Sequence, residues 1–553
     1  MKRLTVNDLT LREKIGQTGC FNPVVAARLG SERNILDYFK DNPFGTMWTA
    51  GHLKLDFVNM AGETEDGKVD KDFDMKLPAF IEAVNRVIRV PFLPAADSTS
   101  PFPAFPSIQS PTGFGASRDP ALLFEEGACI GREMALTGAK YSWCPVADNA
   151  SPFNSVMINR CYSCDVELAG KMVAAFVKGM QSEGVAATLK HFPGAGKDEY
   201  RDPHFSDQTI AEEKETWYAR QGRIFKDGVD AGAMSVMTSH GSFPAIDDEK
   251  IGGRYVPASM SKKIVTDLLK GEMGFTGVVI TDAVDMRALN SVFPTKAQMY
   301  AKILNAGVDI ILGPMDNDYI DIVERCVKDG IIPEERIDDA CERVLAMKEK
   351  LGLFENPVPV VSEEKRRAAI EKTREFARRA APKTITWCSK ADTGFLPVKK
   401  ENVKRVQIIY LAYRAVPNAA TETLKDEFEK HGALVDVTDH IDSGLHMKTM
   451  ADSHDLIVYA LCVGAHNPFG FASFFGEKCL NFLYALLYGK EKSVGLSLGS
   501  PFTWHMWFPA CENFLNVYSD AEEPVRAAVR GLYGECELTG THPFDPNPLA
   551  PRQ

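Results

Sequence analysis

The sequence lacks several features that mark whole classes of protein. It has no apolar run long enough to cross a bilayer and no low-complexity tract. The first residues, MKRLTVNDLTLREKIGQ, contain neither the apolar stretch nor the small-residue cleavage site of a secretory signal. No run of lysine and arginine interleaved with aromatic residues occurs, and the formal net charge is -12. We therefore expect a soluble, cytoplasmic protein that binds neither membranes nor nucleic acid.

Cysteine is too thinly spread to suggest a framework of disulfide bonds, with 12 cysteines scattered through 553 residues. A chain of this length can build its hydrophobic cores without such cross-links. Cys161 and Cys164 form one C-x-x-C pair, but no second pair completes a four-cysteine zinc site. We expect mostly buried, reduced thiols and neither a metal nor a cofactor. The sequence gives no indication of an oligomeric state.

One pattern repeats through the first two-thirds of the chain: a short apolar run, a polar residue at its end and a helix-like segment. The apolar runs cover residues 90–96, 141–147, 185–189, 233–237, 278–281 and 308–312. Uniformly apolar runs suit strands buried on both faces, and alternation with helices predicts parallel pairing. At intervals of roughly 40–50 residues, this pattern is typical of a (β/α)8 barrel of the TIM type.

A second domain is expected after the barrel. We predict a barrel over residues 1–355, and then a linker with a helix at 356–383, because glycine and proline interrupt the pattern there. Alternating apolar and helical segments then predict an open α/β sandwich domain over 384–553 that ends in an extended tail. Its predicted strands cover residues 406–410, 433–437, 456–461 and 494–498. The expected fold class is therefore α/β.

An aspartate follows one of the predicted barrel strands directly. The segment GFTGVVITDAVDM combines a glycine turn, a β-branched strand and then Asp282. Catalytic groups of barrel enzymes lie at the carboxyl ends of the strands, which favours a catalytic Asp282. Aspartate is equally common as the cap of a following helix. The residues alone leave both interpretations open.

A second polar segment, LKHFPGAGKDEYRDPHFS, follows another predicted strand. Lys190 and His191 lie side by side at the strand end, and Asp202 precedes His204 by two residues. In an extended segment such residues point to one side, so the carboxylate can bond one ring nitrogen and leave the other to transfer a proton. A D-x-H sequence also occurs as an ordinary loop contact. His240 can likewise contact a ligand or only close a loop.

Several motifs in order along the chain carry a more specific resemblance. They are LTLREKIGQ, GREMALTGAKYSWCPVADN, EGVAATLKHFPGAG with its D-x-H, VMTSH, GFTGVVITDAVDM, LGLFENP, FARRAAPKTITW and SLGSPF. Together they resemble glycoside hydrolase family 3, in its β-N-acetylglucosaminidase branch. The resemblance implies a retaining β-glycosidase that acts on a carbohydrate, with terminal β-linked N-acetylhexosamine as the expected substrate.

The resemblance also implies roles for individual residues. The nucleophile of the family falls on Asp282, and the proton donor of this branch falls on His204, with Asp202 behind it. The implied sugar-binding residues are Asp97, Arg160, Lys190 and His191, and His240 is a further candidate. Carboxylate and ammonium groups suit vicinal hydroxyls, and a guanidinium offers a rigid fork of donors.

The sequence departs from the branch in the predicted sugar pocket. DSTSPF stands where the branch has D-x-E-G-G-R, KHFPGAG has Ala195 in place of a second histidine, and RCY replaces RSF. These changes leave open a β-glucosidase or β-xylosidase of the same family. A histidine donor also leaves no carboxylate to repel an anion, so phosphate can be expected as an alternative acceptor. A metal-dependent hydrolase using His191, His204, His240 and Asp282, and a sugar-binding protein without activity, are the remaining alternatives.

Overall fold

A computed structural model gives the fold of the chain. It describes residues 3–22, 25, 29, 32–49, 73–97, 105–149, 157, 159–195, 201, 203–204, 206–286, 289, 295–314, 317–412, 416–463, 478–504 and 511–544. Asp202 and residues 545–553 of the predicted tail (541–553) lie outside these residues. The chain forms two compact units: 1–106, 123–149 and 170–372 make up the first, and 107–122, 150–169 and 373–553 the second.

Parallel strands make up the centre of the first unit. They are β1 (Gly19–Phe21), β2 (Thr46–Trp48), β3 (Leu93–Ala96), β4 (Tyr141–Ser142), β5 (Thr188–Phe192), β6 (Ser235–Thr238), β9 (Val278–Thr281) and β10 (Ile311–Leu312). One sheet has the order β10-β1-β2-β3-β4, and the other has the order β5-β6-β9. Single parallel bridges, Tyr141 with Ala186 and Ile280 with Ile310, link the two. The ring therefore closes, which confirms the predicted (β/α)8 barrel.

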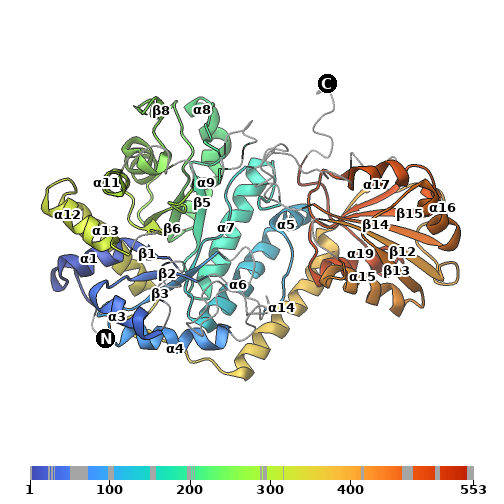
Figure 1. The fold of residues 1–553 in the computed structure, drawn as a ribbon, viewed down its shortest axis with the longest axis horizontal. Coiled ribbons are helices and arrows are strands. Elements are labelled where there is room, and N and C mark those ends of the chain that lie inside the picture. The colour runs from blue at the N-terminus through green and yellow to red at the C-terminus, as the bar shows by residue number, and fades with distance from the viewer. Residues whose placement is uncertain are drawn as a thin grey trace. The chain divides into compact units, whose positions relative to one another are not determined.

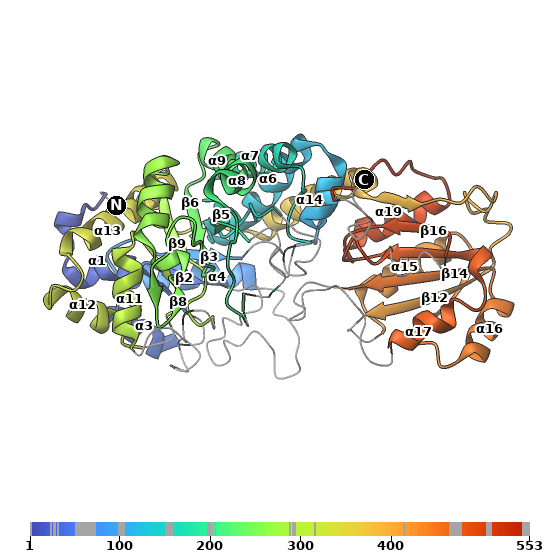
Figure 2. The same ribbon diagram turned by 90° about the horizontal axis from the view of Figure 1, so that it is seen from above.

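Helices between the strands lie around the outside of the barrel (Figures 1 and 2). They include α3 (Glu32–Asp41), α4 (Phe73–Asn85), α6 (Pro120–Thr137), α7 (Val166–Ser182), α9 (Arg223–Asp230), α11 (Lys296–Asn305), α12 (Tyr319–Lys328) and α13 (Glu334–Lys350). Helix α13 buries Ile337, Cys341, Val344 and Lys348, which recur at helical spacing along one face. The strands themselves are buried throughout β3, β5, β6 and β9, as their apolar sequences predict.

The second unit is built on one mixed sheet, with the strand order β11-β16-β15-β14-β12-β13. Its strands are β11 (Thr386–Ser389), β12 (Arg405–Ala412), β13 (Leu434–Thr438), β14 (Leu456–Cys462), β15 (Ser493–Ser497) and β16 (Asn513–Asn516). All pairs are parallel except β11 with β16. Figure 1 shows α15 (Ala419–Lys430) and α19 (Glu522–Leu532) on one side, and α16 (Gly444–Ser453) and α17 (Lys478–Ala485) on the other. This is the predicted α/β sandwich.

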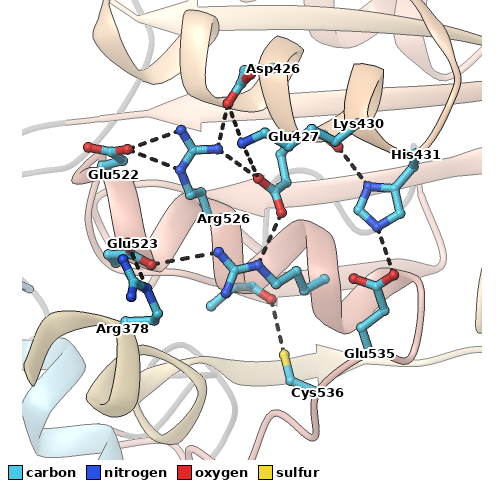
Figure 3. A network of polar contacts seen from close by, with 12 residues as sticks. Arg378, Asp426, Glu427, Lys430, His431, Glu522, Glu523, Arg526, Glu535 and Cys536 are labelled. Carbon is cyan, nitrogen blue, oxygen red and sulfur yellow. Dashed lines mark hydrogen bonds and ion pairs between the residues drawn. The ribbon is translucent and has the colours of Figure 1, made fainter. Parts of the chain in front are cut away.

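Charged side chains join α15 to α19 (Figure 3). Glu427 is buried, and each of its carboxylate oxygens meets an arginine: Oε2 lies 2.7 Å from Arg526 Nη1, and Oε1 lies 3.0 Å from Arg530 Nε. Burial alone raises the pKa of the Glu427 carboxyl, but the two guanidinium groups outweigh it and hold that pKa below its usual value. The carboxylate therefore stays charged between the helices.

The second unit draws two segments from the first half of the chain. Gln109 donates to Thr384 Oγ1 at 2.8 Å, and Ser163 donates to the Pro543 carbonyl at 2.9 Å. The Thr541 amide also donates to the Ala116 carbonyl, at 2.8 Å. Residues 107–122 and 150–169 thus belong to the same compact unit as the C-terminal sheet. Among the helices in the described part of the chain, we find none with the length and apolarity needed to span a membrane.

Candidate functional site

Polar side chains gather where three neighbouring barrel strands end. Lys190 and His191 lie in β5, His240 follows β6, and Asp282 follows β9. Strands β5, β6 and β9 are parallel neighbours in one sheet, so their carboxyl ends lie at the same rim of the barrel. Asp97 follows β3 and joins this group through a contact with Lys190. Four segments that lie far apart in the sequence therefore meet at one place.

The Asp282 carboxylate is held by its own backbone and surrounded by groups that favour its charge. Its backbone amide donates to the Thr238 carbonyl at 2.8 Å, and its Oδ1 accepts from the Ala283 amide at 2.8 Å. Burial raises the pKa of the Asp282 carboxyl, but nearby groups outweigh this effect, so its pKa lies below the usual value. The groups that lower it are His191, His240, the Ala283 amide and Lys190. Asp282 is therefore ionised at neutral pH.

His240 is buried beside Asp282, and both of its ring nitrogens have partners. Nδ1 lies 2.9 Å from Ser259 Oγ, and Nε2 lies 3.0 Å from the Ala283 carbonyl oxygen. Burial lowers the pKa of His240, although the charge of Asp282 acts in the opposite direction. The imidazole is therefore neutral near pH 7. Sequence reasoning did not single out Ser259, because PASMS carries no charge or recognisable spacing that sets this hydroxyl apart.

Lys190 is almost completely buried and bonds to Asp97. Lys190 Nζ lies 2.8 Å from Asp97 Oδ1, and the side chains are 2% and 41% exposed. The ammonium group thus lies under the rim, while part of the aspartate faces solvent. Such a pair can present a carboxylate oxygen to a hydroxyl group without leaving the buried charge unpaired.

Asp148 holds the segment that carries His191. Its Oδ2 accepts from the His191 amide at 3.1 Å and lies 2.8 Å from His191 Nδ1, while Oδ1 accepts from the Ala195 amide at 2.9 Å. The Asp148 side chain has no exposed surface. The peptide bond between Lys190 and His191 is cis. Asp148 therefore fixes both the backbone and the ring of His191, and leaves Nε2 of that ring to face other groups.

The remaining predicted residues lie elsewhere. His204 is exposed in the loop after β5, and its predicted partner Asp202 is outside the described residues. Arg160 is half-buried in a segment of the second compact unit, where its amide donates to the Met157 carbonyl at 2.9 Å. The roles given to His204, Asp202 and Arg160 stay predictions. Within the part of the chain that the structure describes, no cluster of three or more His, Cys, Asp or Glu side chains is arranged to hold a metal ion.

The region around this site matches the model of a known protein family. Residues 99–347 match the model described as the glycosyl hydrolase family 3 N terminal domain. A beta-N-acetylglucosaminidase/beta-glucosidase of Cellulomonas fimi is 27% identical over 75% of this chain and 76% of its own length. A beta-hexosaminidase of Stenotrophomonas maltophilia is 36% identical over 35% of this chain, and a beta-glucosidase C of Emericella nidulans is 31% identical over 44%. The chain spans only 54% and 41% of the length of these last two proteins.

Solved structures match nearly the whole fold. A structure titled beta-glucoside phosphorylase BglX superposes with a TM-score of 0.82 and 21% identity, over 98% of this chain and 95% of the other. A glycoside hydrolase family 3 beta-N-acetylglucosaminidase from Paenibacillus sp. superposes with a TM-score of 0.78 and 23% identity, over 97% and 99%. These likenesses support the fold of both compact units. The match over residues 99–347 leads to one conclusion: this part of the chain is a glycosyl hydrolase family 3 N terminal domain.

Proposed function

We propose that this protein is a retaining β-glycosidase of family 3 that removes terminal β-linked N-acetylhexosamine, with Asp282 as its nucleophile. The observation that carries the proposal is an ionised carboxylate at the end of a barrel strand, with Lys190, His191 and His240 around it. A nucleophile must be charged and must lie where a sugar can enter. Asp282 satisfies the first condition through its lowered pKa and the second through its place at the barrel rim.

The reaction takes place in two steps. The Asp282 carboxylate attacks the anomeric carbon, the bond to the glycosidic oxygen breaks, and His204 donates a proton to the departing oxygen. Water then attacks the anomeric carbon of the glycosyl-Asp282 ester, gives its proton to His204 and releases the carboxylate. The exposed His204 exchanges protons readily with solvent, and in this proposal its ring donates to the Asp202 carboxylate, which would support the imidazolium form. Lys190 and Asp97 bind the sugar hydroxyls.

Two substitutions separate the two catalytic roles. Asp282→Asn should lower kcat by at least roughly a thousandfold on every substrate, because the nucleophile is lost. His204→Ala should lower kcat strongly for glycosides with basic leaving groups, and much less for dinitrophenyl glycosides, which leave without protonation. Asp248→Asn, at a largely exposed aspartate outside this group of residues, is the control and should keep most of the activity. Full turnover by Asp282→Asn would refute the proposal.

The second part of the proposal is the identity of the sugar. The relatives are named for N-acetylhexosamine or for glucose, so both sugars must be tested. The Cellulomonas fimi protein carries both activities in its name, and the Emericella nidulans protein is called a beta-glucosidase. We expect aryl N-acetyl-β-glucosaminide to be cleaved faster than aryl β-glucoside or β-xyloside, because the D-x-H loop matches the acetamido branch. A higher kcat/KM for the glucoside, with His204→Ala fully active, would instead favour a β-glucosidase.

Phosphate is an alternative to water in the second step. A structure of the same fold is titled beta-glucoside phosphorylase, and a histidine donor leaves no second carboxylate to repel an anion. The same aryl glycosides should be assayed with and without phosphate. Sugar 1-phosphate formed in the phosphate assay would make the chain a phosphorylase, whereas free sugar alone would make it a hydrolase.

A further inference from the structure

Ser259 lies behind His240, away from the residues to which the proposed function gives a role. It lies in a short 3-10 helix, Ala258–Met260, and is fully buried. Its Oγ lies 2.9 Å from His240 Nδ1, and the opposite ring nitrogen lies 3.0 Å from the Ala283 carbonyl oxygen. The hydroxyl, the ring and the carbonyl therefore form a continuous chain of hydrogen bonds that ends one residue from Asp282.

The partners of His240 fix which nitrogen carries the proton. A carbonyl oxygen can only accept, so Nε2 must be protonated to donate to Ala283. In the neutral ring Nδ1 is then an acceptor, and the Ser259 hydroxyl is the donor that satisfies it. Without that hydroxyl, a buried ring nitrogen would lose its partner, at a cost of about 1–3 kcal/mol for a buried polar group.

Ala283 connects the ring of His240 to the carboxylate of Asp282. The Ala283 amide donates to Asp282 Oδ1 at 2.8 Å, and the Ala283 carbonyl accepts from His240. The backbone amide of Asp282 itself donates a hydrogen bond to the Thr238 carbonyl of β6 at 2.8 Å. A rotation of the His240 ring would release the Ala283 carbonyl, which belongs to the peptide unit next to the one whose amide orients the carboxylate.

We propose that Ser259 is a positioning residue, whose hydroxyl holds His240 in one orientation and tautomer and thereby fixes the backbone that aims the Asp282 carboxylate. This inference rests on the proposed role of Asp282 as the nucleophile. Ser259 acts through His240 and has no contact with the substrate.

The charges around His240 give this role a pH dependence. Asp282 and Asp285 face His240 and favour its imidazolium form, while burial opposes that form. The Ser259 hydroxyl can donate to the neutral ring and accept from a protonated Nδ1, so its removal leaves a buried imidazolium without an acceptor and should lower the pKa of His240 further. An imidazolium beside Asp282 would pair with the carboxylate and weaken it as a nucleophile. Loss of Ser259 should therefore cost activity at neutral pH through misplacement of the carboxylate, while the acidic limb of the pH profile moves to lower pH.

Three variants test the proposal in the full-length enzyme, with an aryl glycoside that the wild type cleaves. Ser259→Ala should lower kcat about 10- to 100-fold, as expected for a slightly misplaced reacting group. KM should change less than kcat, and the acidic limb of the profile should move to lower pH. Ser259→Thr keeps the hydroxyl and should restore both kcat and the profile. Ser261→Ala is the matched control, because that hydroxyl bonds to Asp247, at 2.5 Å, and should leave the profile unchanged.

The outcomes separate this inference from the proposed function. Ser259→Ala with wild-type kcat and pH profile would overturn the inference, as would a Ser259→Thr variant no better than Ser259→Ala. If Ser259→Ala does not fold, Ser259→Cys keeps a side chain of similar shape with a poor donor and should show the same shift. NMR titration of the imidazole Cε1 proton of His240, with histidine-labelled enzyme, should show a lowered pKa in Ser259→Ala and needs no turnover. A wild type inactive on every glycoside would refute the proposed function, while the titration would still decide the role of Ser259.

Discussion

Asp148 is a residue whose effect on the site is indirect but strong. It has no exposed side-chain surface, yet it accepts hydrogen bonds from the amides of His191 and Ala195 and contacts the ring of His191. We predict that Asp148→Ala lowers the free energy of unfolding by about 3 kcal/mol or more, because the three buried groups that bond to the carboxylate lose their partner. Urea denaturation measures this, and a loss below 1 kcal/mol would contradict it. kcat/KM should fall as well, because His191 is released.

Glu126 shows the opposite case, a buried acid whose charged form is disfavoured by burial. It is almost completely buried on α6, its Oε2 has no hydrogen-bond partner among the described residues, and burial raises the pKa of its carboxyl well above the usual value. A raised pKa in the folded state means that the acid opposes folding more strongly as pH rises through the unfolded value. Glu126→Leu should therefore raise the free energy of unfolding by about 1–3 kcal/mol near pH 7.

The gain from Glu126→Leu should shrink as pH falls below the pKa of an unfolded glutamate. Glu126→Gln is the control, since it removes the titration but keeps a polar group in the same place. Equal stability of wild type and Glu126→Leu at pH 7 would show that the carboxyl has found a partner.

The individual residues of the site were predicted to different degrees. Asp282, Lys190 and His191 carry functional groups at strand ends and stand in recognisable motifs, so the sequence points to them. Ser259 could not be found this way. Its importance comes from a contact with His240, 19 residues away, and a serine that bonds a histidine looks in sequence like any other serine.

Helix α13 is attached to the barrel through Lys348, which is fully buried. Its ammonium donates to Gln17 Oε1 at 2.8 Å, the Gly45 carbonyl at 2.9 Å and the Pro91 carbonyl at 2.7 Å. These acceptors lie in α1 (Leu11–Gln17) and just before strands β2 and β3. One side chain therefore connects three elements at the end of the barrel opposite to Asp282.

The Lys348 contacts predict a change of stability with pH. Burial lowers the pKa of Lys348 to about 7, below its unfolded value of 10.5. The unfolded chain then binds more protons between these two values, so the contribution of Lys348 to stability rises with pH above 7 and is lost as pH falls through 7. At pH 9 the amine is neutral and has two N–H donors, so Lys348→Met should lower the free energy of unfolding by about 2 kcal/mol through their loss.

The measurement for Lys348 is the stability difference between wild type and Lys348→Met, taken from denaturation at several pH values. The difference should grow between pH 7 and pH 9. A difference that falls over this range would contradict the lowered pKa.

The elements that were predicted from sequence are the ones with long apolar runs. The runs ending at Asp97 and Asp282 correspond to β3 and β9, and the run at 456–461 corresponds to β14. Strands β1 and β2 were not identified, because each has only three residues, GCF and TMW, and glycine, threonine and single aromatics give no periodic signal. Pairing with neighbouring strands, and not local sequence, makes these segments extended.

The chain as a whole is not divided in simple sequence order. Residues 107–122 and 150–169 belong to the unit of the C-terminal sheet, with the bonds of Gln109 to Thr384 and Ser163 to Pro543 as examples. Local sequence patterns cannot reveal that these early segments pack with the C-terminal sheet, because the packing depends on contacts between residues hundreds of positions apart. The sequence-based boundaries at 355 and 383 stay predictions.

A shortened chain tests this division. A fragment of residues 1–372 keeps the barrel strands but loses the partners of 107–122 and 159–169. We predict that a protease cuts these two segments in the fragment at least about tenfold faster than in the full chain, because their closing contacts are absent. Equal cleavage rates in the fragment and the full chain would contradict the division.

The most direct test of the proposed mechanism is to trap the covalent glycosyl-Asp282 ester on the full-length enzyme. A 2-deoxy-2-fluoro glycosyl fluoride slows both steps but should still form the ester. After digestion, mass spectrometry should find one added sugar on the peptide that contains Asp282, and none in Asp282→Asn. A sugar on a different carboxylate, or complete turnover with no ester at any substrate concentration, would contradict the retaining mechanism proposed for this chain.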